Sequence, residues 1–103
     1  MLKEISKIEQ IEVLKGFKGR FFHTSSSTIA FWEIEKDSLL PEHTHIHEQT
    51  TQLLEGILEM TIGKETVVLV PGMIVCIPSN IKHSGKALTT CKLTDTFCPV
   101  RED

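Results

Sequence analysis

The chain has 103 residues, of which 40% are hydrophobic and 24% charged, and its formal net charge is −3. This composition is typical of one small globular protein, so we expect residues 1–103 to form a single domain around one modest core. The acidic balance and scattered Lys and Arg argue against a nucleic-acid partner, and no apolar run approaches the ~20 residues that span a bilayer.

The start of the chain and its cysteines bear on the cellular compartment. Residues 1–10 contain no apolar core of the kind that directs export. The three cysteines, Cys76, Cys91 and Cys98, are an odd number without a CxxC pair. Such cysteines fit reduced thiols that fill space in a core. We therefore expect a cytoplasmic protein with no membrane partner.

The first sixteen residues admit two interpretations. Leu2, Ile5, Ile8 and Ile11 recur at every third position, which suits a series of helical turns. The same segment also suits an extended strand at the edge of a sheet. The sequence leaves this choice open.

From residue 21 onward, short runs rich in Ile, Val, Leu, Phe and Thr alternate with turn signals. The run TIAFWEI (28–34) is apolar at nearly every position, which predicts a strand buried on both faces. In LLEGIL (53–58), two strands are expected to meet at a tight turn whose glycine supplies a positive φ. MIVCIPSN (73–80) contains a proline that cannot continue a central ladder. Short strands at this spacing favour an all-β sandwich or barrel.

The run ALTTCKLTDTF (87–97) alternates, so Asp95 and Phe97 share one face of a strand with Leu93. If Leu93 faces the interior, Asp95 does so too. A carboxylate inside a barrel is costly unless it is paired or used in chemistry, so Asp95 is a candidate functional residue. Arg101 lies just beyond this strand, where it can reach back over the mouth of the barrel.

The histidines are concentrated in one short stretch. Of the five in the chain, His43, His45 and His47 lie within five residues. On a strand, His43 and His45 would point to one face with Cβ atoms roughly 7 Å apart, which allows both imidazoles to bind one metal ion. A bulge at 46–48 would decide whether His47 or Gln49 turns inward, and the sequence leaves this open.

The remaining two histidines differ in their setting. His83 follows a β-branched run and a Pro-led turn, and it stands at the start of the next expected strand. That position would let it close a site opened by His43 and His45. His23 has no such setting, and we interpret it as a surface strand residue.

These two histidine segments resemble the two motifs of the cupin superfamily. The first motif is Gly, five residues, His-x-His, three or four residues, Glu, six residues and Gly. Here Asp37 takes the place of the first Gly, and Gln49 that of the Glu. The second motif is Gly, five residues, Pro-x-Gly, two residues, His, three residues and Asn. Here Asn80 replaces the Gly and Ala87 the Asn. The resemblance implies a double-stranded β-helix, a jelly-roll barrel with a metal in its wider end.

The resemblance also implies that His43, His45, Gln49 and His83 bind one divalent transition metal ion. Gln49 offers a neutral amide oxygen where the family has a carboxylate, so the ion would keep its full charge. Such a site is a strong Lewis acid, and it suits a redox oxygenase less well, since those commonly pair two histidines with one carboxylate. Ni, Zn, Mn, Fe and Co all remain candidates.

The end of the chain is similar to a narrower group, the small cupins of the pectin degradation protein type. These carry His-Glu-Gln after the His-x-His, and a terminal pattern close to Asp-x-Phe-x-Pro-x-Arg-Glu-Asp, which here begins at Asp95. The similarity implies a metal-dependent, non-redox enzyme that opens the ring of 4,5-unsaturated uronates from pectin or alginate. Asp95 would carry the proton, Arg101 would bind the uronate carboxylate, and Phe97 would face the sugar ring. Relatives tend to have an apolar or aromatic residue at one threonine of QTTQLL, so the substrate can differ.

Two alternatives stay open at this stage. One is a metal-containing cupin that binds a small molecule such as a sugar without catalysis, and the other is a metal-dependent dioxygenase. Gln49 and the lack of Tyr count against the dioxygenase. We interpret Arg20 as a surface strand residue. The alternative is that Arg20 makes a second contact with the substrate carboxylate. We expect a homodimer, because small cupins commonly pair through sheet edges or outer faces.

Overall fold

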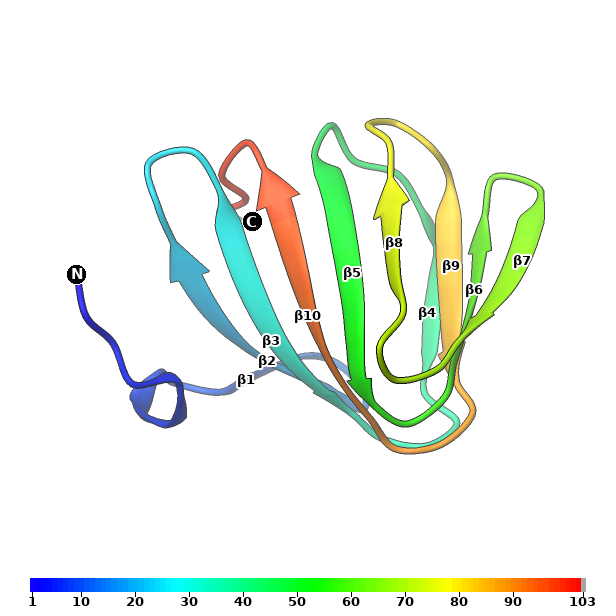
Figure 1. Cartoon of the computed structure of the whole chain (residues 1–103), viewed down its shortest axis with the longest axis horizontal. Helices are drawn as coiled ribbons and strands as arrows, with labels where there is room; N and C mark the ends of the chain where they lie inside the picture. Colours follow the sequence, from blue (N-terminus) through cyan, green and yellow to red (C-terminus); the bar gives the residue numbers. More distant parts are fainter. Residues whose placement is uncertain (103) are drawn as a thin grey trace.

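A computed structural model describes residues 1–102 as two antiparallel β-sheets that face each other (Figure 1). The chain begins with one turn of 3-10 helix, η1 (Ile5–Lys7), and ten strands follow: β1 (Ile11–Leu14), β2 (Phe17–His23), β3 (Thr28–Ile34), β4 (Leu39–His43), β5 (Glu48–Glu55), β6 (Leu58–Ile62), β7 (Glu65–Leu69), β8 (Ile74–Ile77), β9 (His83–Ala87) and β10 (Cys91–Cys98). No helix within these residues is long and apolar enough to cross a membrane.

The strand order is that of a jelly roll. One sheet has the order β1-β2-β3-β10-β5-β8 and the other the order β4-β9-β6-β7. The chain passes from one sheet to the other at β3–β4, β4–β5, β5–β6, β7–β8, β8–β9 and β9–β10, so both sheets wrap one shared interior. The expectation of an all-β jelly-roll barrel is confirmed. Its core is apolar and consists of Phe17, Ile34, Leu53, Leu58, Met60, Leu69, Ile77, Ala87, Cys91 and Leu93.

Strand β10 follows the predicted alternation. Every second residue from Cys91 is buried, including Leu93, Asp95 and Phe97, and the residues between them are half-buried or exposed. Because β10 lies between β3 and β5, Asp95 projects into the interior from the middle of the six-stranded sheet.

Strand β3 differs from the sequence prediction, which had both of its faces buried. Thr28, Ala30 and Ile34 are buried, whereas Phe31 is half-buried and Glu33 is exposed. Only one face of this sheet is covered by the second sheet, and the other faces outward, as antiparallel sheets allow.

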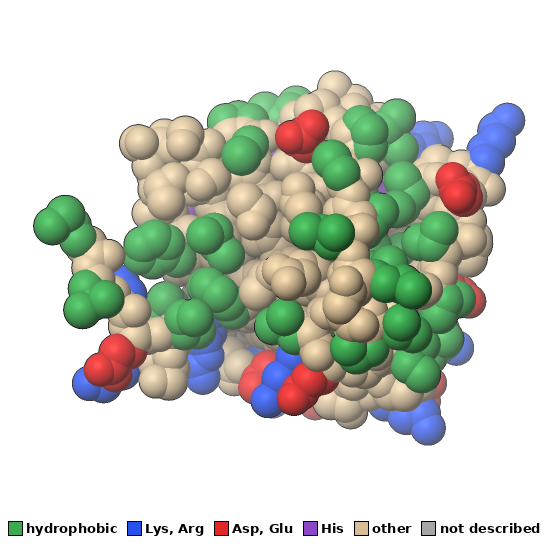
Figure 2. Space-filling model, in the orientation of Figure 1, with side chains coloured by type: hydrophobic (Ala, Val, Ile, Leu, Met, Phe, Trp, Pro, Cys, Tyr) green, Lys and Arg blue, Asp and Glu red, His purple; other side chains and the backbone are tan. Residues whose placement is uncertain are grey.

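The outward face of the six-stranded sheet carries hydrophobic side chains among charged ones such as Glu33, Glu48 and Lys92. Figure 2 shows hydrophobic side chains gathered over β5 and β8. Leu54 of β5 is 49% exposed and Ile74 of β8 is 63% exposed. Such a patch fits the expectation that two copies pair through their outer faces, although the homodimer itself stays a prediction.

The turn at Gly56 has the predicted positive φ, at 94°. It does not form a hairpin, because β5 and β6 belong to different sheets. A Cβ atom at this position would lie 2.3 Å from the carbonyl oxygen of Thr90. Gly56 therefore forms a tight corner between the two sheets, and this corner has no room for a side chain.

Of the two interpretations of the first sixteen residues, helical turns or an extended edge strand, the structure agrees in part with the second. η1 is a single turn rather than a series, and β1 pairs with β2 at the edge of the sheet. Arg20 donates hydrogen bonds from Nη1 to the carbonyl oxygens of Ser6 and Ile8. Arg20 thus holds the N-terminal segment against β2, a role that neither sequence interpretation of this residue had included.

Candidate metal and substrate site

Three histidines from two separate parts of the chain meet in the interior. His43 and His83 are direct cross-strand neighbours on β4 and β9, with ring centroids 4.2 Å apart. The ring centroid of His45 is 4.9 Å from that of His83. One nitrogen atom from each ring lies within 4.8 Å of the others. The sequence prediction placed His43 and His45 on one strand, but β4 ends at His43, and His45 converges on the cluster from the loop that follows.

Each of these three rings is oriented by a backbone carbonyl group. Nδ1 faces the carbonyl oxygen two residues earlier in His43 and His83, at 2.8 and 2.9 Å, and two residues later in His45, at 3.0 Å. Because a carbonyl oxygen only accepts, each Nδ1 donates its proton and each Nε2 keeps a lone pair. This is the tautomer in which an imidazole binds a metal through Nε2 while a backbone group fixes its orientation.

Gln49, on β5, reaches the same cluster from the opposite sheet. Its Oε1 lies 3.0 Å from Nε2 of His45. The amide is oriented by its Nε2, which donates to Oγ1 of Thr51 at 3.0 Å and to Oδ1 of Asp95 at 3.1 Å. Two lone-pair atoms therefore face each other, and this contact is favourable only when a cation or a proton lies between them.

A metal cation fits this contact better than a proton does. Burial, and then the charge of Arg101, lower the pKa of His45, so its ring is neutral at neutral pH. Burial also lowers the pKa of His83. Nε2 of His83 is buried and has no hydrogen-bond partner among residues 1–102. A buried lone pair without a partner is unfavourable, and a divalent transition metal bound by imidazole and amide groups would satisfy it.

His47 occupies a different place from the cluster. It is buried, but its Nε2 lies 3.3 Å from the carbonyl oxygen of Val100. The group of converging nitrogen atoms does not include it. Of the two residues that the sequence left open, the structure places Gln49 against His45 and directs His47 toward the end of the chain.

Two turns, one before β4 and one before β9, contain unusual backbone conformations. Asp37 and Asn80 have φ angles of 69° and 64°. These are the positions at which the chain lacks the glycines of the cupin motifs, and Asp and Asn tolerate the left-handed region better than other residues with side chains. The N–H of Asn80 donates to the carbonyl oxygen of His45 at 2.9 Å. Asn80 thus ties the turn before His83 to His45, whereas Asp37 lies at the other end of β4, where its N–H donates to the carbonyl oxygen of Ala87.

Asp95 lies beside this cluster and is only 7% exposed. Thr51, its direct neighbour on β5, donates from Oγ1 to Oδ1 at 2.5 Å, and Gln49 donates to the same oxygen. The indole N–H of Trp32 lies near the carboxyl group but outside hydrogen-bonding geometry. Burial raises the pKa of Asp95 to about 6, against the opposing effects of these donors and of Arg101. The carboxyl group can therefore exchange a proton near neutral pH.

Arg101 lies over the ring of Phe97, with its guanidinium carbon 4.9 Å from the ring centroid. Its backbone is held by Thr28, whose Oγ1 accepts from the N–H of Arg101 at 2.9 Å. The same hydroxyl is 2.8 Å from Nδ1 of His23. Thr28 is buried, so it fixes the start of the terminal segment from inside the barrel. The sequence reasoning missed Thr28, although its shared parity with buried Ala30 on β3 was a signal.

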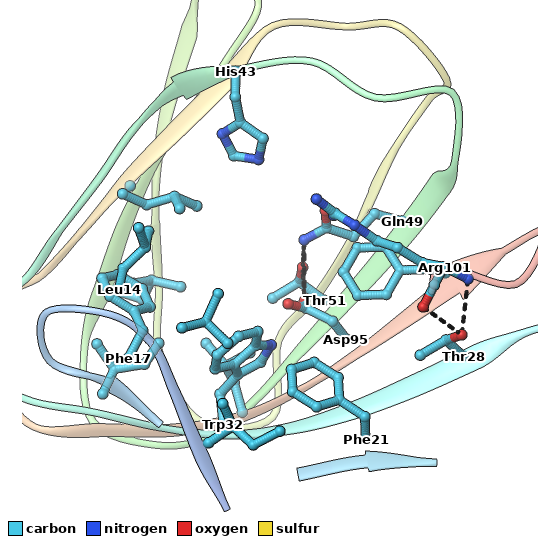
Figure 3. A pocket seen from close by; sticks show the side chains of 18 of the residues that line it. Leu14, Phe17, Phe21, Thr28, Trp32, His43, Gln49, Thr51, Asp95 and Arg101 are labelled. Carbon is cyan, nitrogen blue, oxygen red and sulfur yellow. Dashed lines mark hydrogen bonds between the residues drawn. The ribbon is translucent and has the colours of Figure 1, made fainter. Parts of the chain in front are cut away.

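A cavity of about 910 Å³ joins these residues. In Figure 3, Gln49, Thr51, Asp95 and Arg101 lie along one side of the cavity, Leu14 and Phe17 lie along the other, and Trp32 lies between them. Of the sequence-predicted site residues, His43, Gln49, Asp95, Phe97 and Arg101 line the cavity. The cavity therefore has a polar wall, which reaches His43 of the histidine cluster, and an apolar part.

Comparisons with known proteins support this fold. A family model described as a cupin domain matches residues 30–97. A similar solved structure is an RmlC-like cupin from Shewanella frigidimarina NCIMB 400, with a TM-score of 0.93 and 24% identity over 98% of this chain and 92% of that one. KdgF from Halomonas sp. has a TM-score of 0.89 and 23% identity over 95% and 92%. Ectoine synthase from P. lautus has a TM-score of 0.87 and 19% identity over 98% and 79%. No curated protein matches the sequence.

Proposed function

Since the chain belongs to the cupin domain family, we propose that it is a metal-dependent, non-redox enzyme acting on a sugar acid. Its proposed reaction is the ring opening of a 4,5-unsaturated uronate. One observation supports this most strongly: the buried carboxyl group of Asp95 is hydrogen-bonded to Gln49, which itself faces the histidine cluster. A proton-exchanging group next to a metal-binding group is what such a reaction needs. Enzymes, among them KdgF, also occur among the proteins of similar fold.

His43, His45, His83 and Gln49 would hold the ion, which would be Ni, Zn, Mn, Fe or Co. When bound, it would supply Lewis acidity that favours loss of a proton from a substrate hydroxyl group. All four side chains are neutral, so they would leave its charge undiminished. The set lacks the carboxylate that iron oxygenases commonly pair with two histidines, which favours non-redox chemistry.

The proposed reaction is an isomerisation in which a proton moves from oxygen to carbon. The anomeric hydroxyl group loses its proton, the bond between C1 and the ring oxygen breaks, and C1 becomes an aldehyde. The ring oxygen leaves as an enolate on C5, and protonation of C4 converts this enolate to the ketone of the linear keto-uronate. Asp95 would accept the first proton and donate one to C4, and its pKa of about 6 suits both steps. No electron is gained or lost.

Two further residues would bind the substrate. Arg101 would bind the uronate carboxylate, because a guanidinium group matches the geometry of a carboxylate with two parallel hydrogen bonds. Phe97 would face the sugar ring, since it is buried beside Arg101 on the same side of the barrel. Thr28 would act through Arg101 by fixing its backbone.

Purified protein should be incubated with a 4,5-unsaturated galacturonate and each of the five metals, and the loss of alkene absorbance followed. We expect acceleration with at least one metal. Asp95→Asn should lower the rate at least ~100-fold and leave the metal content unchanged, because general acid–base groups contribute 10²–10⁴-fold. No acceleration with any metal would remove the proposal. Unchanged ligand affinity in Asp95→Asn, without turnover in either protein, would instead indicate a binding protein.

A further inference from the structure

The cavity is larger and more apolar than a sugar ring requires. Its volume of about 910 Å³ lies near the top of the ~300–1,000 Å³ range of pockets for drug-sized ligands. Next to the polar wall, the side chains are apolar, and we call this region the apolar chamber. It is lined by Leu14, Phe17, Phe21, Trp32, Leu40 and Met60.

The chemistry of the apolar chamber disfavours a ligand with hydroxyl groups on every side. A hydroxyl group that leaves water needs a hydrogen-bond partner, and burial without one costs roughly 1–3 kcal/mol in proteins. Leucine, methionine and phenylalanine side chains offer no such partner. Alkyl or aromatic groups, by contrast, gain from burial there in proportion to their area.

The charged groups around the cavity define the other end of the ligand. Arg101 stands on the polar wall beside Gln49 and near Asp95 (Figure 3). Glu9 and Glu102 also line the cavity, and both are exposed. Arg101 attracts one carboxylate, and the two glutamates repel a second negative charge at the rim. The charges therefore favour a monoanion.

We propose that the apolar chamber binds the apolar body of an amphipathic monocarboxylate whose carboxylate group lies at Arg101. The position of the carboxylate rests on the proposed function, whereas the apolar chamber stands on the lining residues alone. Applied to the proposed reaction, the inference means that the natural sugar acid carries an apolar substituent, which a bare monosaccharide lacks.

The chain itself provides a reporter of binding. Trp32 is the only tryptophan in the sequence, and it lines the apolar chamber. Straight-chain monocarboxylates from butanoate to decanoate, and galacturonate, should be titrated into the protein as purified while its fluorescence is followed. We expect affinity to rise about fourfold for each added methylene group. Hexanoate should bind more tightly than galacturonate, which has the same number of carbon atoms. A flat series, or tighter binding of galacturonate, would overturn the inference.

Two matched variants locate the site. Leu14→Glu places a charge on the wall of the apolar chamber, at a β1 residue that is 41% exposed. Val68→Glu makes the same change on β7, at a residue that is 49% exposed and does not line the cavity. We expect decanoate affinity to fall at least tenfold in Leu14→Glu and to stay unchanged in Val68→Glu. Equal affinities in the two variants would contradict the assignment.

The outcome of this experiment is independent of the outcome of the test of the proposed function. A rise of affinity with chain length, without turnover of the unsaturated uronate, would retain the apolar chamber and remove the proposed reaction. Turnover of the uronate with a flat chain-length series would do the opposite. Binding is measured without turnover, so neither result depends on the other.

Discussion

Replacement of Asp95 by Asn tests whether the buried carboxyl group lowers the stability of the protein. Asn keeps an Oδ1 acceptor for Thr51 and Gln49 and removes the group that titrates. In the native protein, burial raises the pKa of Asp95 from 3.8 to about 6. The native state therefore binds the proton more tightly than the unfolded state does. The resulting stabilisation is fully present below pH 3.8 and is lost as the pH rises through about 6.

The size of this effect follows from the two pKa values. The interval from 3.8 to about 6 corresponds to about 3 kcal/mol, since each tenfold change in an equilibrium constant is 1.36 kcal/mol. The side chain is buried, so solvent screens the effect little. At pH 8, metal-free Asp95→Asn should exceed the metal-free wild type by about 3 kcal/mol in free energy of unfolding. At pH 4 the two proteins should differ little.

Urea unfolding of EDTA-treated protein, followed by the fluorescence of Trp32 between pH 4 and pH 8, measures this difference. Glu48→Gln is the matched control, because Glu48 is an exposed carboxylate on the neighbouring strand β5. Its substitution should leave the pH dependence unchanged. The reasoning is wrong if Asp95→Asn differs from the wild type equally at pH 4 and pH 8, or if it is the less stable protein at pH 8.

Three further predictions follow from the site. His83→Ala should reduce bound metal from one ion per chain to almost none in elemental analysis, whereas His47→Ala should retain it; equal loss in both would contradict the proposed ligands. Thr28→Val should raise the KM for the uronate about tenfold, with a smaller effect on kcat, because the backbone N–H of Arg101 loses its hydrogen-bond acceptor. Thr28→Ser keeps the hydroxyl group and should have a KM close to that of the wild type. Asn80→Ala should lower the free energy of unfolding by about 1–2 kcal/mol, because residue 80 has a positive φ, whereas Asn80→Gly should not lower it. Equal stability of the two variants in urea unfolding would refute this prediction.

Residues whose position follows from strand parity and motif spacing were predictable. The alternation around Asp95 identified its buried face, because side chains on a strand alternate strictly. The spacing of His43, His45 and His83 identified three residues that the structure brings together. Asp37 and Asn80, which stand where the cupin motifs have glycine, both adopt a positive φ, the region that glycine enters most readily. The single domain, the homodimer and the cytoplasmic location stay predictions.

Features that depend on contacts between distant segments were not predictable. The strands that meet at Gly56 lie in different sheets, and no local signal separates a corner from a hairpin. Thr28 contacts Arg101 across most of the chain length, and Arg20 contacts backbone groups of the N-terminal segment. The choice between Gln49 and His47 depended on the path of the loop after β4, which parity does not determine.

The most direct test is a crystal structure of the metal-loaded protein with anomalous diffraction measured at the absorption edge of the bound metal. We expect one anomalous peak, bound by Nε2 of His43, His45 and His83 and by Oε1 of Gln49. A peak elsewhere, or a peak that the imidazole of His83 does not bind, would contradict the metal centre and the reaction proposed for it.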